Sequence, residues 1–555
     1  MSRTRLILWI CILLSAVFMS IPWLVPHCGF FALFGLVPLL IAEEIAEKQG
    51  VRRSWWMIYL CFVLWNAATT WWVKNATVGG AVFAVLANAL QMGVIWWAFR
   101  QFKRRVAGVL PYIFLAVLWI AWEKWYLQSA EISWPWLVLG NAFAQSTRSV
   151  QWYEITGSLG GSLWVWTANI SIFWMLRSLT GEPMKPWIRK ALPAWTLAVI
   201  AFPYAASAYI WHNFEEDSEG ALPVVIAQPN FDPYEKFEAM SQAEQTEVLL
   251  SLYEEALQGD GDWKGLLIAP ETFTGDVFLD DIASGHTFRC FQTFLKRHPG
   301  AGLLFGASTY DIYRDRHSKP HILARRFGNG WVVNHNSAIL TDTSGRADVF
   351  HKSKLVVGTE LTPYPKIFVP IDDKLGGVMG RCVGQEHIAC VRHLKYDAEG
   401  GRECVMVGVP VCYESVYGEY CTGYVKMGAR MLAVITNDAW WGDTPGYKQH
   451  LSYSCLRAIE TRRDIARCAN TGISAIIDQR GEILSSTGWW QRCTLTGEVN
   501  LSSRTTFFVR HGDLVGLACV ILTLLFALFW CTLIVTRKKL VNHAGNPCEI
   551  PRSRI

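Results

Sequence analysis

Three polar side chains, each placed directly after an apolar strand-like run, are the residues best suited to covalent chemistry. They are Glu271 in Ala-Pro-Glu-Thr-Phe, Lys352 in Phe-His-Lys-Ser-Lys-Leu and Cys412 in Val-Pro-Val-Cys-Tyr-Glu-Ser. A thiol attacks only as the thiolate, and a free pKa of about 8.5 leaves little thiolate at neutral pH. Glu271 is suited to take the thiol proton, and Lys352 to stabilise the oxyanion formed when the thiolate attacks a carbonyl. The three residue types therefore predict acyl transfer through a thioester on Cys412.

Each of these residues also has a simpler structural interpretation when it is taken alone. A cysteine after an apolar run is often an inert buried thiol, a glutamate there often caps a helix, and a lysine beside a hairpin is usually a solvated surface charge. Their shared position at strand ends, where α/β folds place functional groups, favours the chemical interpretation.

The elements that must position these residues lie in the middle of the chain, where short β-branched runs alternate with helix-like stretches. This alternation predicts a layered α/β fold, and the absence of a repeat or linker predicts one domain over 212–510. The predicted strands are Val224–Ala227, Gly265–Ala269, Gly302–Gly306, Ser337–Thr341, Val405–Val409, Leu432–Thr436 and Ser474–Asp478. The predicted helices are Ser241–Gln258, His286–Lys296, Ser415–Met427 and Lys448–Cys468. Asp342–Gly345 and Arg480–Gly481 are predicted turns.

Both ends of the chain are apolar enough to enter a membrane. The composition of 52% hydrophobic and 17% charged residues is atypical of a soluble protein. Eight spans are predicted, with seven as the alternative: Leu6–Leu24, Phe30–Ile41, Trp55–Trp72, Gly79–Trp97, Val109–Trp122, Gly157–Leu176, Ala191–Ile210 and Leu514–Val535. The predicted division is therefore seven helices in 1–211, the α/β domain in 212–510, a last span in 511–536 and a cytoplasmic tail in 537–555.

The distribution of lysine and arginine predicts the orientation, because these residues are retained on the cytoplasmic side. Alternate loops and the tail carry the basic residues Arg3, Arg5, Lys48, Arg52, Arg53, Arg100, Lys103, Arg104, Arg105, Arg177, Lys185, Arg189, Lys190, Arg537, Lys538 and Lys539. The α/β domain is then expected on the outer face, and the first span is expected to stay uncleaved. The formal charge of +5 is small and scattered, which argues against nucleic-acid binding.

The order of the three residues resembles the Glu-Lys-Cys triad of the nitrilase, or carbon-nitrogen hydrolase, superfamily. The resemblance continues through Ile435–Gly442, His450, Arg457–Glu460, Arg467–Gly472 and Gly481–Glu482. It implies a four-layer αββα domain, with Glu271, Lys352 and Cys412 as catalytic residues.

The spans make the chain similar to the apolipoprotein N-acyltransferase branch of that superfamily. Thr506–Asp513, and the outer loop that contains Trp134 and Trp136, are also similar to that branch. Glu360, Tyr413 and Glu414 are expected to support the triad or bind substrate. One departure is Val357–Glu360, where the branch usually has Pro-Phe-Gly-Glu.

The resemblance implies a bacterial inner-membrane enzyme with its catalytic domain on the periplasmic side. It would act as a monomer without a cofactor or metal, moving a fatty acyl chain from a phospholipid to the N-terminal amine of a diacylated apolipoprotein. Loops 231–237, 361–368 and 440–447 are candidate lids over the site, with ordinary packing as the alternative. Trp134 and Trp136 would lie in an interfacial belt or beside a lipid path.

The predicted outer domain contains an odd number of cysteines: Cys290, Cys382, Cys390, Cys404, Cys412, Cys421, Cys455, Cys468 and Cys493. Cys412 is expected to stay free, and the others to form up to four pairs or remain thiols. The alternative functions are a membrane-anchored amidase, with water as acceptor, and a transporter or inactive scaffold. The scarcity of ionisable residues inside the spans disfavours transport.

Overall fold

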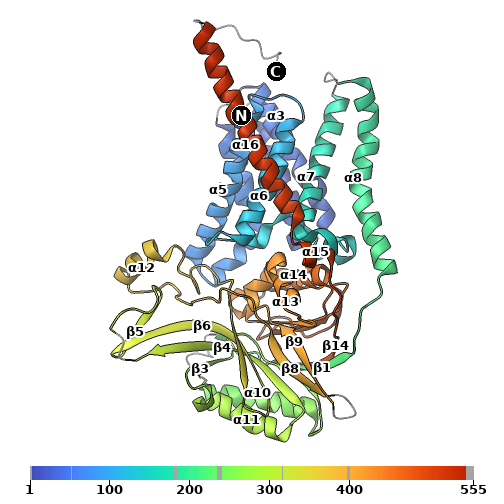
Figure 1. Cartoon of the computed structure of the whole chain (residues 1–555). Helices are drawn as coiled ribbons and strands as arrows, with labels where there is room; N and C mark the ends of the chain where they lie inside the picture. Colours follow the sequence, from blue (N-terminus) through green and yellow to red (C-terminus); the bar gives the residue numbers. More distant parts are fainter. Residues whose placement is uncertain are drawn as a thin grey trace.

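The computed structural model has two parts, a bundle of long helices and an α/β domain attached to one end of it (Figure 1). It describes residues 3–51, 53–180, 184–233, 240–314, 317–396 and 401–544, and side chains as far as Thr536. The first candidate lid, 231–237, lies mostly outside the described residues. The first described helix begins at Arg3, and the last ends at Ala544, at the end of the bundle away from the α/β domain.

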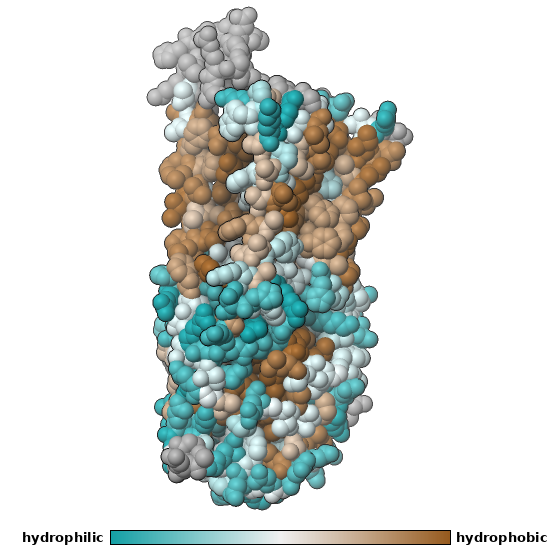
Figure 2. Space-filling model, turned by 90° about the vertical axis from the view of Figure 1, so that its right-hand side faces the viewer, coloured by the Kyte–Doolittle hydropathy of each residue, from teal (hydrophilic) through white to brown (hydrophobic). Residues whose placement is uncertain are grey.

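The bundle is built from apolar helices whose outward side chains remain exposed. The helices are α1 Arg3–Leu24, α2 Ala32–Gly35, α3 Val37–Lys48, α4 Ser54–Thr70, α5 Val78–Lys103, α6 Leu110–Gln128, α7 Tyr153–Leu179, α8 Pro186–Asn213 and α16 Leu514–Ala544. Exposed Leu, Ile, Val, Phe and Trp side chains form the hydrophobic band in the upper half of the molecule (Figure 2). Such a band suits lipid rather than water.

Six segments in the described part of the chain are long and apolar enough to cross a membrane, against the eight predicted. The other two predicted spans are helical but fall short. Helix α4 has only 17 residues, and α6 carries Glu123 and Lys124 within its last turns. Two predicted boundaries also differ from the helix ends. The predicted Phe30–Ile41 span is a 3-10 turn, Gly29–Phe31, followed by the separate helices α2 and α3. The last predicted span ends at Val535, whereas α16 continues to Ala544.

The α/β domain contains two sheets. The eight-stranded sheet comprises β1 Ala221–Gln228, β2 Gly265–Ile268, β3 Thr274–Phe278, β4 Ala301–Tyr313, β5 Arg325–Phe327, β6 Gly330–Thr341, β7 Ala347–His351 and β14 Cys493–Asn500. The six-stranded sheet comprises β8 Val391–Tyr396, β9 Arg402–Gly408, β10 Met431–Thr436, β11 Ile465–Ala469, β12 Ala475–Ile477 and β13 Ile483–Ser486. Strands β1, β2 and β4 run parallel, as do β9, β10 and β11.

The alternation of side chains along these strands produces the layers. Val224 and Ile226 of β1 meet Val405 and Val434 of the other sheet in a single buried core. Val225 points the opposite way, into a second core formed with α10 Gln242–Leu257 and α11 His286–Arg297. On the far side, α13 Gly418–Lys426 and α14 Pro445–Thr461 cover the six-stranded sheet. The predicted four-layer αββα domain next to membrane helices is confirmed.

Helix α14 is the element that joins the two parts. Leu451 and Ala458 face the sheets, whereas Tyr453 and Ile459 belong to the core of the bundle, so nearly every residue of this helix is buried. The sequence prediction of one helix over Lys448–Cys468 was wrong at its end. Arg462 adopts a left-handed conformation, with φ of 49°, which ends α14, and β11 then pairs with β10.

The other predicted elements hold with small changes. The predicted Ser415–Met427 helix begins as a 3-10 turn, Cys412–Val416, and continues as α13. Both predicted turns occur between paired strands, and Gly345 and Gly481 have φ of 77° and 76°, the region that glycine adopts without strain. The nine cysteines of the predicted outer domain are all free thiols.

Candidate active site

Cys412 stands in a tight turn, Val411–Val416, that follows β9 at the carboxyl end of the six-stranded sheet. Its φ of 50° is unusual for a residue with a side chain, and a parallel bridge from Val411 to Ile435 holds the turn against β10. Only 8% of Cys412 is exposed. Burial raises the pKa of the thiol well above its ordinary value, Glu271 raises it further, and Lys352 lowers it. Cys412 therefore rests as a protonated thiol that needs a base to become a nucleophile.

Glu271 and Lys352 form a buried ion pair beside this turn. Glu271 follows β2 and Lys352 follows β7, and the Lys352 Nζ to Glu271 Oε1 distance is 2.9 Å. Although burial by itself lowers the pKa of Lys352, Glu271 and Glu360 together raise it well above its ordinary value. Lys352 is thus a cation in a site from which water is largely excluded, where its charge acts most strongly.

Glu360 and Asn336 complete what we call the Glu271–Lys352 cluster. Lys352 Nζ lies 3.0 Å from Glu360, and the Asn336 amide donates to both Glu271, at 2.8 Å, and Glu360, at 2.7 Å. The backbone N–H of Asn437 donates to the second oxygen of Glu271 at 3.1 Å. The Val357–Gly358–Thr359 departure leaves this geometry in place, because Glu360 still reaches Lys352.

Glu414 connects the Cys412 turn to the Lys352 loop rather than facing solvent. Its carboxylate accepts the backbone N–H groups of Val411, at 2.8 Å, and Ser353, at 2.6 Å, together with the Tyr420 hydroxyl at 2.9 Å. Through these hydrogen bonds Glu414 holds the Cys412 turn and the Lys352 loop in position. Tyr413 points toward the bundle, where its hydroxyl donates to the Ser133 carbonyl at 2.9 Å.

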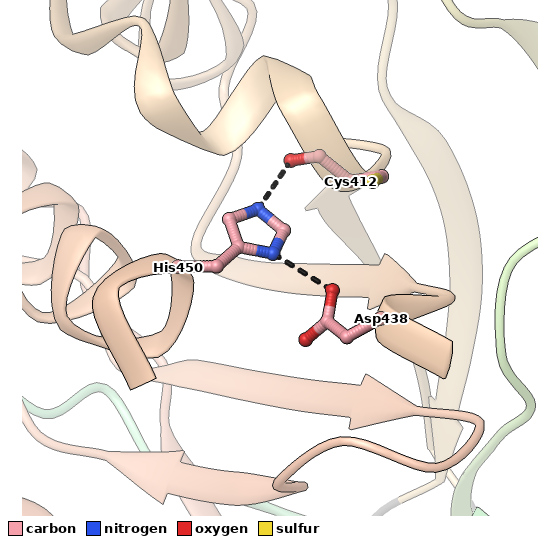
Figure 3. Close-up of side chains that lie close together, drawn as sticks. All are labelled: Cys412, Asp438 and His450. Atoms are coloured by element: carbon pink, nitrogen blue, oxygen red, sulfur yellow. Dashed lines mark hydrogen bonds and ion pairs between the residues drawn. The ribbon is translucent and has the colours of Figure 1, made fainter. Parts of the chain in front are cut away.

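A second polar cluster, formed by Asp438, His450 and Arg467, contacts the backbone of Cys412. Figure 3 shows its Asp438 and His450 beside Cys412. His450 Nε2 lies 3.1 Å from the Cys412 carbonyl oxygen, so this nitrogen must carry the donated hydrogen. His450 Nδ1 lies 2.9 Å from Asp438, and Arg467 donates to the other Asp438 oxygen at 2.6 Å. Burial raises the pKa of Asp438, but His450 and Arg467 outweigh it and leave the pKa below its ordinary value.

Cys412, Asp438 and His450 are the one group in the described chain whose ligand atoms are spaced closely enough for a metal ion. Cys412 Sγ, one Asp438 oxygen and one His450 nitrogen lie within 4.8 Å of one another. However, Asp438 is already bound by Arg467 and His450, and a cation placed there would be repelled by the guanidinium. The donor set therefore fits an internal ion-pair network better than a metal.

An aromatic wall separates the site from the bundle. Trp136 contacts Trp72 and His450, and Trp134 stacks on Tyr413 with ring centroids 6.4 Å apart. Gln449 of α14 accepts hydrogen bonds from the Trp72 and Trp136 indoles at 3.2 and 2.7 Å. The Ser-Trp-Pro-Trp loop, residues 133–136, is thus packed against the catalytic turn.

The two other candidate lids differ in how they pack. Loop 361–368 leads into α12, Pro365–Lys374, where Ile367 and Phe368 are exposed. Loop 440–447 packs instead, because Trp441 contacts Trp72 and Asn75 donates to the Trp441 carbonyl at 2.7 Å.

The structure brings together the sequence-predicted Glu271, Lys352, Cys412, Glu360 and Glu414, and turns Tyr413 toward the bundle. Sequence reasoning missed Asn336, and it matched Asp438, His450 and Arg467 as parts of motifs without giving them a role. The available signal was weak, since Asn336 lies in β6 within a polar run, Asn334–Ser337, at the point where the strand becomes apolar.

Comparison with known proteins shows two family matches. Residues 15–171 match the apolipoprotein N-acyltransferase N-terminal domain, and residues 321–507, which contain Lys352 and Cys412 but not Glu271, match the carbon-nitrogen hydrolase family. The chain is 29% identical to the apolipoprotein N-acyltransferase of Chlorobaculum tepidum, over 90% of this chain and 91% of that one. It is 27% identical to the protein of the same name from Geobacter metallireducens, over 91% of this chain and 92% of that one.

Proposed function

Because this chain belongs to the apolipoprotein N-acyltransferase family, we propose that it acylates diacylglyceryl-cysteine apolipoproteins with a fatty acyl chain from a membrane phospholipid. The observation that carries the proposal is a buried thiol beside a Glu-Lys ion pair, in a domain docked on apolar membrane helices. The chain by itself contains all of these groups, so we propose that it acts as a monomer.

In the first half-reaction, Glu271 takes the Cys412 proton and the thiolate attacks an ester carbonyl of the phospholipid. Lys352 stabilises the oxyanion of the tetrahedral intermediate, a contribution of about 3 kcal/mol in comparable oxyanion sites. When the carbon–oxygen bond breaks, the lysophospholipid alkoxide takes the proton back from Glu271. The acyl chain remains on Cys412 as a thioester.

In the second half-reaction, the neutral α-amine of the diacylated cysteine attacks the thioester. Glu271 accepts a proton from the amine, and the carbon–sulfur bond breaks as the amide forms. The proton then returns to the Cys412 thiolate, which restores the resting thiol. Donor and acceptor thus use the same site in turn, which is a ping-pong mechanism.

The membrane bundle explains how the site reaches its substrates. Withdrawing a lipid chain from hydrocarbon costs about 0.8 kcal/mol per CH₂, so a site at the bilayer surface avoids most of that cost. We propose that the catalytic domain faces the periplasm. Support comes from the basic residues Arg100, Lys103 and Arg177, which lie in the last turns of α5 and α7, at the end of the bundle away from the catalytic domain, as expected for a cytoplasmic side.

The test is to incubate the detergent-purified protein with a phospholipid labelled in its acyl chain and to follow the label by mass spectrometry. We expect a hydroxylamine-sensitive label on the Cys412 peptide that moves to the amine of an added diacylated lipopeptide. Cys412→Ala should abolish the label, whereas Cys404→Ala, which removes an exposed thiol, should not. Label that leaves Cys412 for water even with the lipopeptide present would identify a hydrolase, and no label would overturn the proposal.

A further inference from the structure

Gln449 lies in the first part of α14, at the boundary between the catalytic domain and the membrane bundle, and only 1% of it is exposed. Its amide oxygen accepts the indole N–H groups of Trp136, at 2.7 Å, and Trp72, at 3.2 Å. Its amide nitrogen donates to the carbonyl oxygens of Trp23, at 3.0 Å, and Thr69, at 3.2 Å. An amide side chain offers two N–H donors and two acceptor positions, so Gln449 is fully hydrogen-bonded, and every one of these partners belongs to the bundle.

The four partners come from three separate segments of the bundle. Trp23 lies at the end of α1, and Thr69 lies at the end of α4 with Trp72 just beyond it. Trp136 belongs to the Ser-Trp-Pro-Trp loop between α6 and α7. Tyr453, one turn further along α14, donates its hydroxyl hydrogen to the Trp136 carbonyl at 2.7 Å. Two successive turns of α14 are therefore tied to the end of the bundle that meets the catalytic domain (Figure 1).

The next residue, His450, faces the Cys412 turn instead, because neighbouring side chains on a helix point about 100° apart. Its Nε2 donates to the Cys412 carbonyl oxygen at 3.1 Å, and its Nδ1 lies 2.9 Å from Asp438. Gln449 and His450 are joined by one peptide bond, so the bundle partners of Gln449 fix where the imidazole meets the backbone of the nucleophile. A step of one residue thus connects the membrane helices to the catalytic turn.

The later turns of α14 are held independently of Gln449. Arg457 donates to the carbonyl oxygens of Val416, at 2.7 Å, and Ser415, at 3.2 Å. It is also paired with Glu460 at 2.9 Å. Loss of the Gln449 hydrogen bonds would therefore free the first turns of the helix, where His450 lies, without undocking the rest.

We propose that Gln449 is a positioning residue for the acyl transfer, through which the membrane bundle sets the place of His450 and hence of the Cys412 turn. The inference rests on the proposed function, because it takes Cys412 as the nucleophile. Cys412 has a φ of 50°, a conformation that side chains rarely adopt and that surrounding contacts must maintain. A displacement of about 1 Å at a reacting group costs up to about 100-fold in rate. The bundle thus contributes to the chemical step as well as to membrane anchoring.

The experiment compares full-length variants in detergent, with p-nitrophenyl butyrate as the acyl donor and the burst of p-nitrophenolate as the readout. Cys412→Ala supplies the background. Gln449→Met keeps the length of the side chain and loses its hydrogen bonds, so the burst rate should fall about 10-fold while KM for the ester stays the same. Gln91→Met is the matched control, because Gln91 also accepts an indole N–H, from Trp122 at 3.1 Å, but bonds within the bundle. That variant should acylate at the wild-type rate.

The discriminating measurement is the double variant that combines Gln449→Met with His450→Gln. Because Gln449 acts through His450, the double variant should acylate within about twofold of His450→Gln alone. Gln449→Glu still accepts from both indoles and disturbs the packing less. It should lose about threefold on its own and nothing further in the His450→Gln background.

A residue that only stabilised the fold would give losses that multiply in the double variants. That result would overturn the proposal, as would a wild-type rate in Gln449→Met. The burst of the unsubstituted protein reports on Cys412 as a nucleophile, and the ratios among the variants report on Gln449. The two proposals therefore fail separately, and neither measurement depends on which lipid is the natural donor.

Discussion

Cys412 is flanked by two buried ionic clusters that are alike in composition and different in what they touch. The Glu271–Lys352 cluster faces the region of the thiol and is built mainly from loops after strands of the eight-stranded sheet. The Asp438–His450 cluster, which includes Arg467, belongs to the six-stranded sheet and α14, and it holds the Cys412 carbonyl. We propose that the first moves a proton and that the second keeps the Cys412 backbone, with its φ of 50°, in position.

The difference teaches that burial and charge do not by themselves identify a catalytic group. Asp438 is as deeply buried as Glu271, and both carboxylates accept hydrogen bonds on both oxygens. They differ in position, because Asp438 is bound to the histidine that holds the Cys412 carbonyl, whereas Glu271 is bound to Lys352. In the proposed mechanism, only the first cluster supplies a base and a cation to the reacting carbonyl. Variants of the first cluster should therefore lose thioester formation, whereas variants of the second should lower kcat in a graded way.

The largest effect is expected for Lys352→Met. The substitution removes the oxyanion's cation and leaves Glu271 and Glu360 as neighbouring carboxylates, so thioester formation should fall by about 10³-fold or more. The rate of labelling of Cys412 by labelled phospholipid measures it. A thermal unfolding curve should show a folded protein, and Lys426→Gln should acylate normally. Thioester formation near the wild-type rate would mean that Lys352 has no chemical role.

Much of the first cluster could be predicted from the sequence. Glu271 and Lys352 each follow a strand, and α/β folds place functional groups at the ends of their strands. The second cluster could not be assigned a role in the same way. His450 lies next to Cys412 because α14 packs between the six-stranded sheet and the bundle. This tertiary packing cannot be predicted from the local sequence pattern. The end of α14 was missed for a similar reason, since Ile465–Ala469 becomes a strand through its pairing with β10.

A smaller effect is expected for His450→Gln. The variant weakens the bond to the Cys412 carbonyl without removing any group that touches substrate, so kcat should fall by about 10- to 100-fold while KM for phospholipid changes little. His450→Ala, which leaves no donor, should be worse than His450→Gln. This graded loss distinguishes a positioning residue from a base, whose loss would be equally severe in both variants. A change in KM alone would contradict the assignment.

The smallest effect is expected for Asp464, a buried carboxyl that lacks the cationic partners of Asp438. Asp464, at the start of β11, is similarly buried but has no cation partner, and burial raises its pKa to about 7, with Glu216 adding to the shift. An acid whose folded pKa is raised binds its proton in the folded state over the range from about pH 4 to pH 7, where the unfolded chain has lost it. Folding stability from this residue is therefore greatest at the acidic end and is lost as pH rises through 7.

We accordingly expect the wild-type protein in detergent to lose a few degrees of thermal midpoint, about 2–4 °C per kcal/mol, between pH 5 and pH 8 through this residue. Asp464→Asn should remove that part of the slope, since the amide does not titrate, whereas the exposed Asp262→Asn should leave the slope unchanged. Circular dichroism at a helical wavelength measures the midpoint. An unchanged slope in Asp464→Asn would show that Asp464 is ionised in the folded protein despite its burial.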